Sequence, residues 1–85
     1  MKIEFDPTKE EANVAKHGIS LSRAVDFEML AVLRDDRFDY GEARFRAWGL
    51  IAGEAYCLAF TIRKDRVRPI SLRRAHDKEM KRYVP

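Results

Sequence analysis

The sequence predicts an α+β fold in which an antiparallel sheet carries a helical hairpin on one face, with a short helix at the end of the chain. Residues 6–29 contain helix start and stop signals, whereas residues 44–74 alternate bulky side chains with small or polar ones, as strands do. With 85 residues, 46% of them hydrophobic, the chain has enough apolar material for one layer of helices on a sheet. We therefore expect residues 1–85 to form a single domain.

The N-terminal third predicts a short strand followed by two helices. Residues 2–5 alternate like a strand. A helix then begins at Asp6 or at Thr8, which are both good N-cap residues, and runs to about His17, where Gly18 ends it in the left-handed conformation. A second helix begins at Ser20 or Ser22, and its expected buried face consists of Ala24, Val25, Phe27 and Met29.

Strand patterns occupy most of the remaining chain. The expected strands cover residues 31–33, 44–51, 55–63 and 66–74. The separators between the last three strands are short enough for antiparallel hairpins. Residues 35–41 are rich in Asp and Gly, so we expect a solvated loop at the rim of the molecule. A short helix over residues 76–84 closes the chain.

Strand alternation assigns the sheet two faces of different chemistry. The bulky face, expected to meet the helices, consists of Phe45, Ala47, Ile51, Tyr56, Leu58, Phe60, Ile62, Ile70 and Leu72. The opposite, open face is expected to present Arg44, Arg46, Trp48, Cys57, Ala59, Thr61, Arg63, Val67, Pro69, Ser71 and Arg73. Pro69 also indicates that its strand is an edge strand or contains a bulge, because proline donates no ladder hydrogen bond.

The charge is divided unevenly along the chain. Residues 44–85 carry eleven Lys or Arg against four Asp or Glu, whereas residues 1–43 carry six against ten. Several arginines of the basic half fall on the open face, among small residues. A cationic, uncrowded sheet face suits a phosphate polymer such as RNA.

Composition excludes several other classes of protein. Cys57 is the only cysteine, so no internal disulfide forms, and with two histidines the chain lacks the soft ligands of a usual zinc site. The apolar run 55–60 is far too short to span a bilayer, and residues 1–4 do not start a signal peptide. We expect a cytoplasmic protein that needs no metal or other cofactor and makes no membrane contact.

Several short motifs together resemble a known family. They are Phe5-Asp6-Pro7 followed by Lys9, Asn13 and Lys16-His17-Gly18-Ile19; Asp39-Tyr40-Gly41-Glu42 with Arg44-Phe45; and Ile70-Ser71 with Arg73-Arg74-Ala75, Glu79 and Tyr83. In this order and spacing the chain resembles the BrnT family, ribonuclease toxins of bacterial type II toxin-antitoxin systems with a RelE-like fold. One departure is Phe5, where the family commonly has Trp.

The resemblance implies a toxin that cleaves RNA on the open sheet face and arrests translation. It also implies a cognate antitoxin, BrnA, whose ribbon-helix-helix domain binds DNA. Because such domains dimerise, we expect two copies of each protein in the complex, with operator DNA contacted only through the antitoxin.

Cleavage of RNA by its own 2′-hydroxyl needs a base, a group that stabilises negative charge on the phosphoryl oxygens, and an acid for the leaving 5′-oxygen. Arginine suits the second task because its planar fork pairs with phosphate, so Arg63 and Arg73 are the first candidates. For base and acid, the family pattern suggests Glu42 and Tyr83, and His17 has a suitable intrinsic pKa. The expected RNA-binding residues are Arg44, Arg46, Trp48, Arg74, Lys81 and Arg82.

Each candidate also has a structural interpretation. The arginines are then ordinary solvated side chains or partners of the acidic half, and His17 is a helix C-terminal residue favoured by the helix dipole. Glu42 would pair with Arg44, and Tyr83 would be a core aromatic. At the level of the whole protein, the alternative is a non-catalytic RNA-binding or protein-interaction module that uses the same basic face. DNA binding by this chain alone is less favoured, because no helix is basic and amphipathic enough to fill a major groove.

Overall fold

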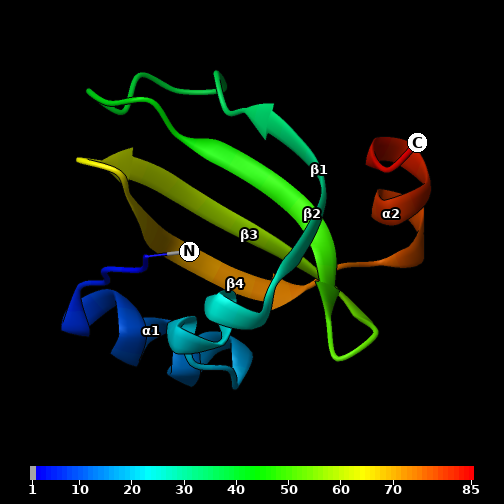
Figure 1. Cartoon of the computed structure of the whole chain (residues 1–85), viewed down its shortest axis with the longest axis horizontal. Helices are drawn as coiled ribbons and strands as arrows, with labels where there is room; N and C mark the ends of the chain where they lie inside the picture. Colours follow the sequence, from blue (N-terminus) through cyan, green and yellow to red (C-terminus); the bar gives the residue numbers. More distant parts are fainter. Residues whose placement is uncertain (1) are drawn as a thin grey trace.

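The computed structural model describes residues 2–85. In chain order the elements are α1 (Pro7–His17), the 3-10 helix η1 (Leu21–Asp26), β1 (Glu28–Arg34), β2 (Phe45–Ile51), β3 (Glu54–Arg63), β4 (Arg66–Arg74) and α2 (Asp77–Tyr83). The strands form one antiparallel sheet in the order β1-β2-β3-β4. In Figure 1 the strands separate α1 and η1 from α2. Among residues 2–85, no helix is long and apolar enough to cross a membrane.

Helix α1 starts at the earlier of its two predicted positions. Asp6 is the N-cap, with its Oδ1 accepting a hydrogen bond from the Thr8 N–H at 2.7 Å, and Pro7 occupies the first turn. Gly18 ends the helix at φ 71°, and its N–H donates to the carbonyl of Val14. The segment before the helix contributes a single bridge, in which Ile3 pairs in parallel with Val67.

The second predicted helix is a short 3-10 helix, and this corrects its expected buried face. With three residues per turn, Leu21, Ala24 and Phe27 fall on one face, and all three are buried. Val25 lies on the other face and is exposed. Met29 is also exposed, because the helix has ended and Met29 already belongs to β1.

A bulge in β4 corrects the predicted faces of that strand. Ala59 pairs with Ser71, but Phe60 pairs with Pro69, so Ile70 is an extra residue. For the residues that precede Ile70 in β4, the predicted faces are therefore exchanged. Pro69 and Val67 lie on the face that meets α1 and η1, not on the open face. Ser71 and Arg73 keep their predicted place. The prediction that Pro69 indicates an edge strand or a bulge is confirmed, since β4 is an edge strand and Ile70, the residue after Pro69, forms a bulge.

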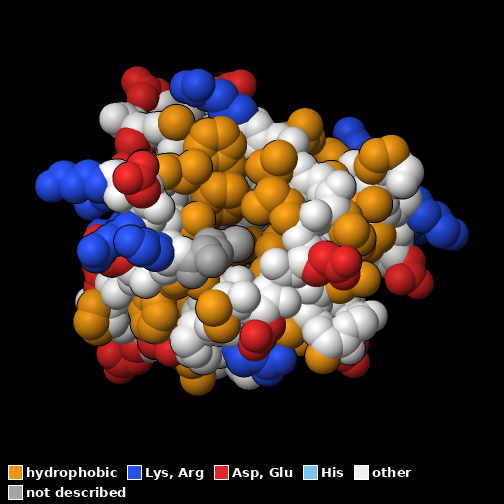
Figure 2. Space-filling model, viewed as in Figure 1, with side chains coloured by type: hydrophobic (Ala, Val, Ile, Leu, Met, Phe, Trp, Pro, Cys, Tyr) orange, Lys and Arg blue, Asp and Glu red, His pale blue; other side chains and the backbone are white. Residues whose placement is uncertain are grey.

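The core lies between η1 and the middle of the sheet. Its buried members are Leu21, Ala24, Phe27, Ala47, Ile51, Leu58, Phe60 and Leu72. Ile62, expected in the core, is instead 55% exposed, one residue before the end of β3. Figure 2 shows hydrophobic side chains gathered over the middle of this view of the molecule, with most Lys and Arg around its margin.

Asn13 of α1 is the only buried residue of that helix, and its side chain forms hydrogen bonds with the backbone of the edge strand β4. Its side-chain amide donates to the Leu72 carbonyl at 2.9 Å, and its Oδ1 accepts from the Leu72 N–H at 3.0 Å. The amide also donates to the Ile19 carbonyl at 2.9 Å. At Leu72, the outer edge of β4 is therefore hydrogen-bonded by a side chain instead of by another strand.

Asn13→Ala is expected to lower the free energy of unfolding by about 2–4 kcal/mol, because it leaves buried backbone groups of Leu72 without partners. Urea denaturation checks this value, with Ala12→Gly as a control for an exposed position on the same helix. A loss no larger than that of the control would mean that water replaces the Asn13 amide at the sheet edge.

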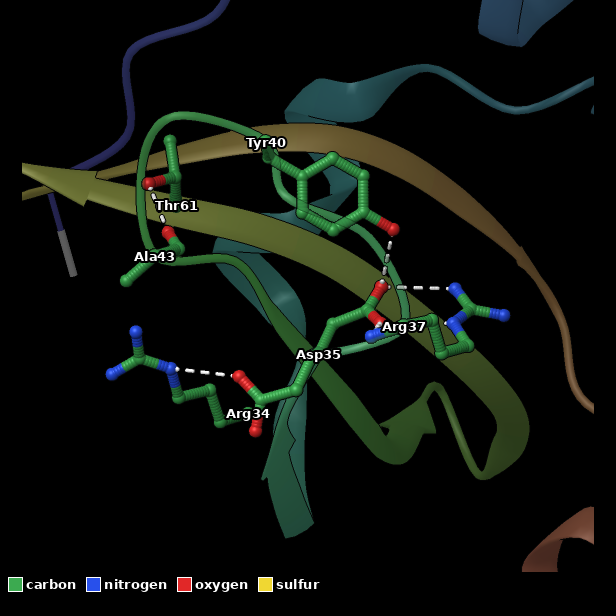
Figure 3. A network of polar contacts seen from close by, with 7 residues as sticks. Arg34, Asp35, Arg37, Tyr40, Ala43 and Thr61 are labelled. Carbon is green, nitrogen blue, oxygen red and sulfur yellow. Dashed lines mark hydrogen bonds and ion pairs between the residues drawn. The ribbon is translucent and has the colours of Figure 1, made fainter.

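The loop after β1 is anchored by a buried carboxylate, which corrects the expectation of a fully solvated loop. Asp35 is 7% exposed and accepts hydrogen bonds from Arg37 Nε at 2.8 Å, Arg37 Nη2 at 2.9 Å and the Tyr40 hydroxyl at 3.2 Å. Figure 3 shows Arg37 and Tyr40 converging on Asp35. These bonds, chiefly those from Arg37, hold the pKa of Asp35 well below its usual range despite burial. The loop is thus fixed in place, although its other side chains face solvent.

Candidate functional site

Two groups of residues, each containing some of the predicted site residues, lie at opposite ends of the sheet. One group lines a depression at the end of β4, and we call it the β4-end cluster: Lys16, His17, Arg73, Arg74, His76 and Glu79. The other contains Glu42, Arg44 and Arg63. Arg73 pairs with Cys57, and Arg63 lies six positions further along β3, so the two arginines are about 20 Å apart. A single phosphate therefore cannot contact both.

His17 lies at the junction of α1 and the β4 edge. It is the last residue of α1, and it shares a second depression with Arg73, Ser71 and Asn13. Burial lowers the pKa of His17, and the charges of Lys16 and Arg73 lower it further. The imidazole is therefore mainly neutral at pH 7 and able to accept a proton.

Arg73 is held by a two-point ion pair with Glu79. Its Nη1 donates to Oε1 at 2.8 Å and its Nη2 to Oε2 at 2.9 Å. The hydrogen bonds from Arg73, supported by those from the His76 N–H and the Trp48 indole, lower the pKa of Glu79 to about 2. The same pair raises the pKa of Arg73. The arginine thus has one orientation and keeps its charge, with 36% of its side chain exposed.

Trp48 is completely buried, which corrects its predicted exposure on the open face. The Tyr83 ring of α2 stacks on it, with ring centroids 3.9 Å apart and planes 12° apart, and its Nε1 donates to Glu79 at 3.2 Å. The Arg46 guanidinium lies 5.3 Å from the centre of the Trp48 ring and 5.8 Å from that of Tyr83. Helix α2 therefore covers this end of the open face.

The group at the other end of the sheet is more open. Arg63 Nη2 lies 3.3 Å from Glu42 Oε2, and the Arg63 side chain is 54% exposed. Glu42 thus pairs with Arg63, not with Arg44 as its structural interpretation proposed. The Arg44 guanidinium instead lies 4.1 Å from the centre of the Tyr40 ring. An exposed pair of this kind contributes little to stability.

The remaining predicted RNA-binding residues belong to the end of β4 and to α2. Arg74 pairs with Tyr56, which puts it on the helix side of the sheet, and its Nη1 lies 3.2 Å from Glu54 Oε2. Lys81 and Arg82 are exposed in the last turn of α2. Because Arg74 also lines the β4-end depression, these cations extend the positive surface beyond Arg73.

Sequence reasoning did not assign roles to Lys16, His76 or Glu79. Glu79 carries a signal that could have found it, since it stands three residues after His76, the spacing of a capping box, and its Oε1 accepts a hydrogen bond from the His76 N–H at 3.1 Å. Within residues 2–85, no three His, Cys, Asp or Glu side chains are grouped to hold a metal ion. The cations that line the depression of the β4-end cluster include Lys16, Arg73 and Arg74.

A neutral histidine beside a fixed arginine, on a basic α+β protein, suits a ribonuclease, and the comparisons with known proteins identify this class. Residues 5–79 match the family described as "Ribonuclease toxin, BrnT, of type II toxin-antitoxin system". The chain therefore belongs to the BrnT family of ribonuclease toxins. An RNA substrate and an antitoxin partner follow from that membership.

A solved structure supports the same assignment. The crystal structure of the Brucella abortus ribonuclease toxin BrnT is similar to this chain with a TM-score of 0.68 and 26% sequence identity, over 91% of this chain and 99% of that one. A sequence search of curated proteins finds no match. The similarity thus covers nearly the whole of both folds.

Proposed function

We propose that the chain cleaves RNA without a metal, through attack of the 2′-hydroxyl on the adjacent phosphate at the β4-end cluster. The observation that carries the proposal is the juxtaposition of His17 with Arg73, in which the imidazole is shifted toward its neutral form partly by the arginine itself. A neutral base next to a fixed cation is what this reaction needs.

In the proposed reaction, His17 takes the proton of the 2′-hydroxyl as that oxygen bonds to phosphorus. Arg73 stabilises the negative charge that builds on the phosphoryl oxygens. The bond from phosphorus to the 5′-oxygen then breaks, and His76, which lines the same depression, protonates the leaving oxygen. The products are a 2′,3′-cyclic phosphate and a free 5′-hydroxyl.

The β4-end cluster is favoured over the pair of Arg63 and Glu42 for two reasons. Arg63 and Glu42 stand in an exposed pair with no neighbouring histidine among the contacts of the described residues. His17 and Arg73 instead share a depression with several further cations. We propose that Arg63, Arg44, Arg46, Lys81 and Arg82 bind the RNA backbone outside the reacting centre, and that Tyr83 and Glu42 do not transfer protons.

The test is incubation of purified protein, freed of antitoxin, with a defined RNA in the presence of EDTA. Cleavage that leaves 2′,3′-cyclic phosphate ends is expected. Cleavage that EDTA abolishes would contradict metal independence, and products with 3′-hydroxyl ends would contradict attack by the 2′-hydroxyl. RNA binding without cleavage would favour the non-catalytic module or a toxin that requires the ribosome.

We also propose that the cognate antitoxin is of the BrnA type, that it forms a complex with two copies of each chain, and that only the antitoxin contacts operator DNA. In this proposal the toxin acts in the cytoplasm and arrests translation. Co-expression followed by light scattering tests the stoichiometry. A stable complex with one copy of each chain would contradict it.

A further inference from the structure

We propose that α2 occupies a nucleotide-binding site of the free protein, with Glu79 in the place of a phosphate and Tyr83 in the place of a base, so that RNA binds there by displacing the helix. This inference rests on the proposed function, because the phosphate whose place Glu79 takes is the one that Arg73 is proposed to stabilise.

The contact between Glu79 and Arg73 has the form of a phosphate contact. A carboxylate that accepts two parallel hydrogen bonds from one guanidinium uses the donors that would otherwise pair with two phosphate oxygens. Arg73 is also the residue best placed to stabilise the reacting phosphate. While Glu79 remains in this position, an incoming phosphate must compete for the same fork.

The contact between Tyr83 and Trp48 has the form of a base stack. The two rings are nearly parallel at a centroid separation of 3.9 Å, an arrangement that a nucleobase adopts on an aromatic platform. Glu79 and Tyr83 are four positions apart on one helix, which separates them by about 6 Å along its axis. One face of α2 therefore presents an acidic group and a ring together, as a nucleotide does.

Helix α2 is poorly suited to be a permanent cover. It has seven residues, none of them buried, and a helix of this length is marginal without tertiary support. Its side-chain hydrogen bonds and ring stacking with the sheet come from Glu79 and Tyr83. Ligands that replace those two contacts therefore remove most of what holds the helix in place.

The Arg46 guanidinium would gain a hydrogen-bond acceptor if RNA replaced helix α2. Its Nε is buried and makes no hydrogen bond within the described residues, although its guanidinium lies near the Trp48 and Tyr83 rings. A buried donor of a charged group without a partner is unfavourable. A phosphate of the bound strand would supply the missing acceptor.

Glu79→Gln tests this proposal through RNA affinity. The affinity should rise if Glu79 competes with phosphate, and should not rise if Glu79 only orients Arg73. Glutamine keeps the size of the side chain and its capping-box function but removes its charge. The matched control is Asp77→Asn, which removes one negative charge from the first turn of the same helix, at a side chain that makes no hydrogen bond or ion pair within residues 2–85. The probe is a labelled, 2′-O-methylated single-stranded RNA oligonucleotide, which the enzyme cannot cleave by 2′-hydroxyl attack.

Glu79→Gln is expected to bind the oligonucleotide about fivefold more tightly than Asp77→Asn, the scale of one partly exposed ion pair. Trp48 is the only tryptophan in the chain, so its fluorescence reports on α2 directly. Saturating oligonucleotide is expected to change Trp48 emission in the native protein. The Tyr83→Ala variant, measured without RNA, gives the emission of Trp48 when no Tyr83 ring covers it.

Two outcomes would overturn the proposal. In the first, Glu79→Gln binds no more tightly than Asp77→Asn, which would make Glu79 a residue that orients Arg73 or simply stabilises the fold. In the second, the oligonucleotide binds with no change in Trp48 emission, or fails to bind any variant. Because the probe cannot be cleaved, these results are independent of the cleavage assay that tests the proposed function.

Discussion

Arg73→Ala is expected to slow RNA cleavage by about a hundredfold or more, because the variant loses a fixed donor pair at the point where phosphoryl charge develops. RNA affinity is expected to fall much less, since several other cations remain nearby. Arg73→Lys is also expected to be slow, because a lysine keeps the charge but not the planar fork. Single-turnover cleavage rates, measured beside RNA affinity over a range of salt concentrations, provide the comparison.

The matched control is Arg63→Ala, which removes the same charge from an exposed arginine about 20 Å away. Its cleavage rate is expected to stay within about threefold of the native rate, as suits a peripheral phosphate contact. Because Arg73→Ala leaves Glu79 unpaired, the double variant Arg73→Ala/Glu79→Gln is measured as well and is expected to remain slow. Equal losses of rate and affinity in Arg73→Ala would instead indicate a binding module.

His17→Asn is expected to reduce the cleavage rate by about 10²- to 10⁴-fold, the usual contribution of a positioned general base. Circular dichroism checks that α1 still forms in the variant. A variant that is folded and cleaves at the native rate would remove His17 from the mechanism and leave Lys16 or Glu79 to be tested as the base.

The pH profile gives a second measure of the same role. The pKa of His17 lies below its ordinary value of about 6.5, so the base is mainly neutral at pH 7. The native rate is therefore expected to fall as the pH drops through the lowered pKa of His17, where the imidazole gains a proton. In His17→Asn this fall is expected to disappear. A profile that is unchanged in the variant would assign the titration to another group.

The sheet was largely predictable from the sequence because strand alternation and turn residues are local signals. The predicted strands 44–51, 55–63 and 66–74 differ from β2, β3 and β4 by no more than one residue at either end. The bulge at Ile70 was not predictable in detail, since one extra residue changes the faces without changing the hydrophobic composition.

The site was predictable in its residue types but not in its arrangement. Alternation assigns Arg63 and Arg73 to one face but does not show that they lie at opposite ends of it. The burial of Trp48 depends on where α2 docks, which is a tertiary contact between segments far apart in the chain. The pairing of an apparently exposed aromatic ring with the apolar stripe of the last helix is the signal that could have indicated it.

The hydrogen bonds between Asn13 and the backbone of Leu72 join positions 59 residues apart in the chain. His17 and Arg73 belong to the same two elements, so the proposed catalytic pair comes together only after β4 has docked against α1. During synthesis, the chain must therefore have left the ribosome as far as β4 before the proposed catalytic pair can form. The cell has that interval in which an antitoxin already present can meet the newly made chain.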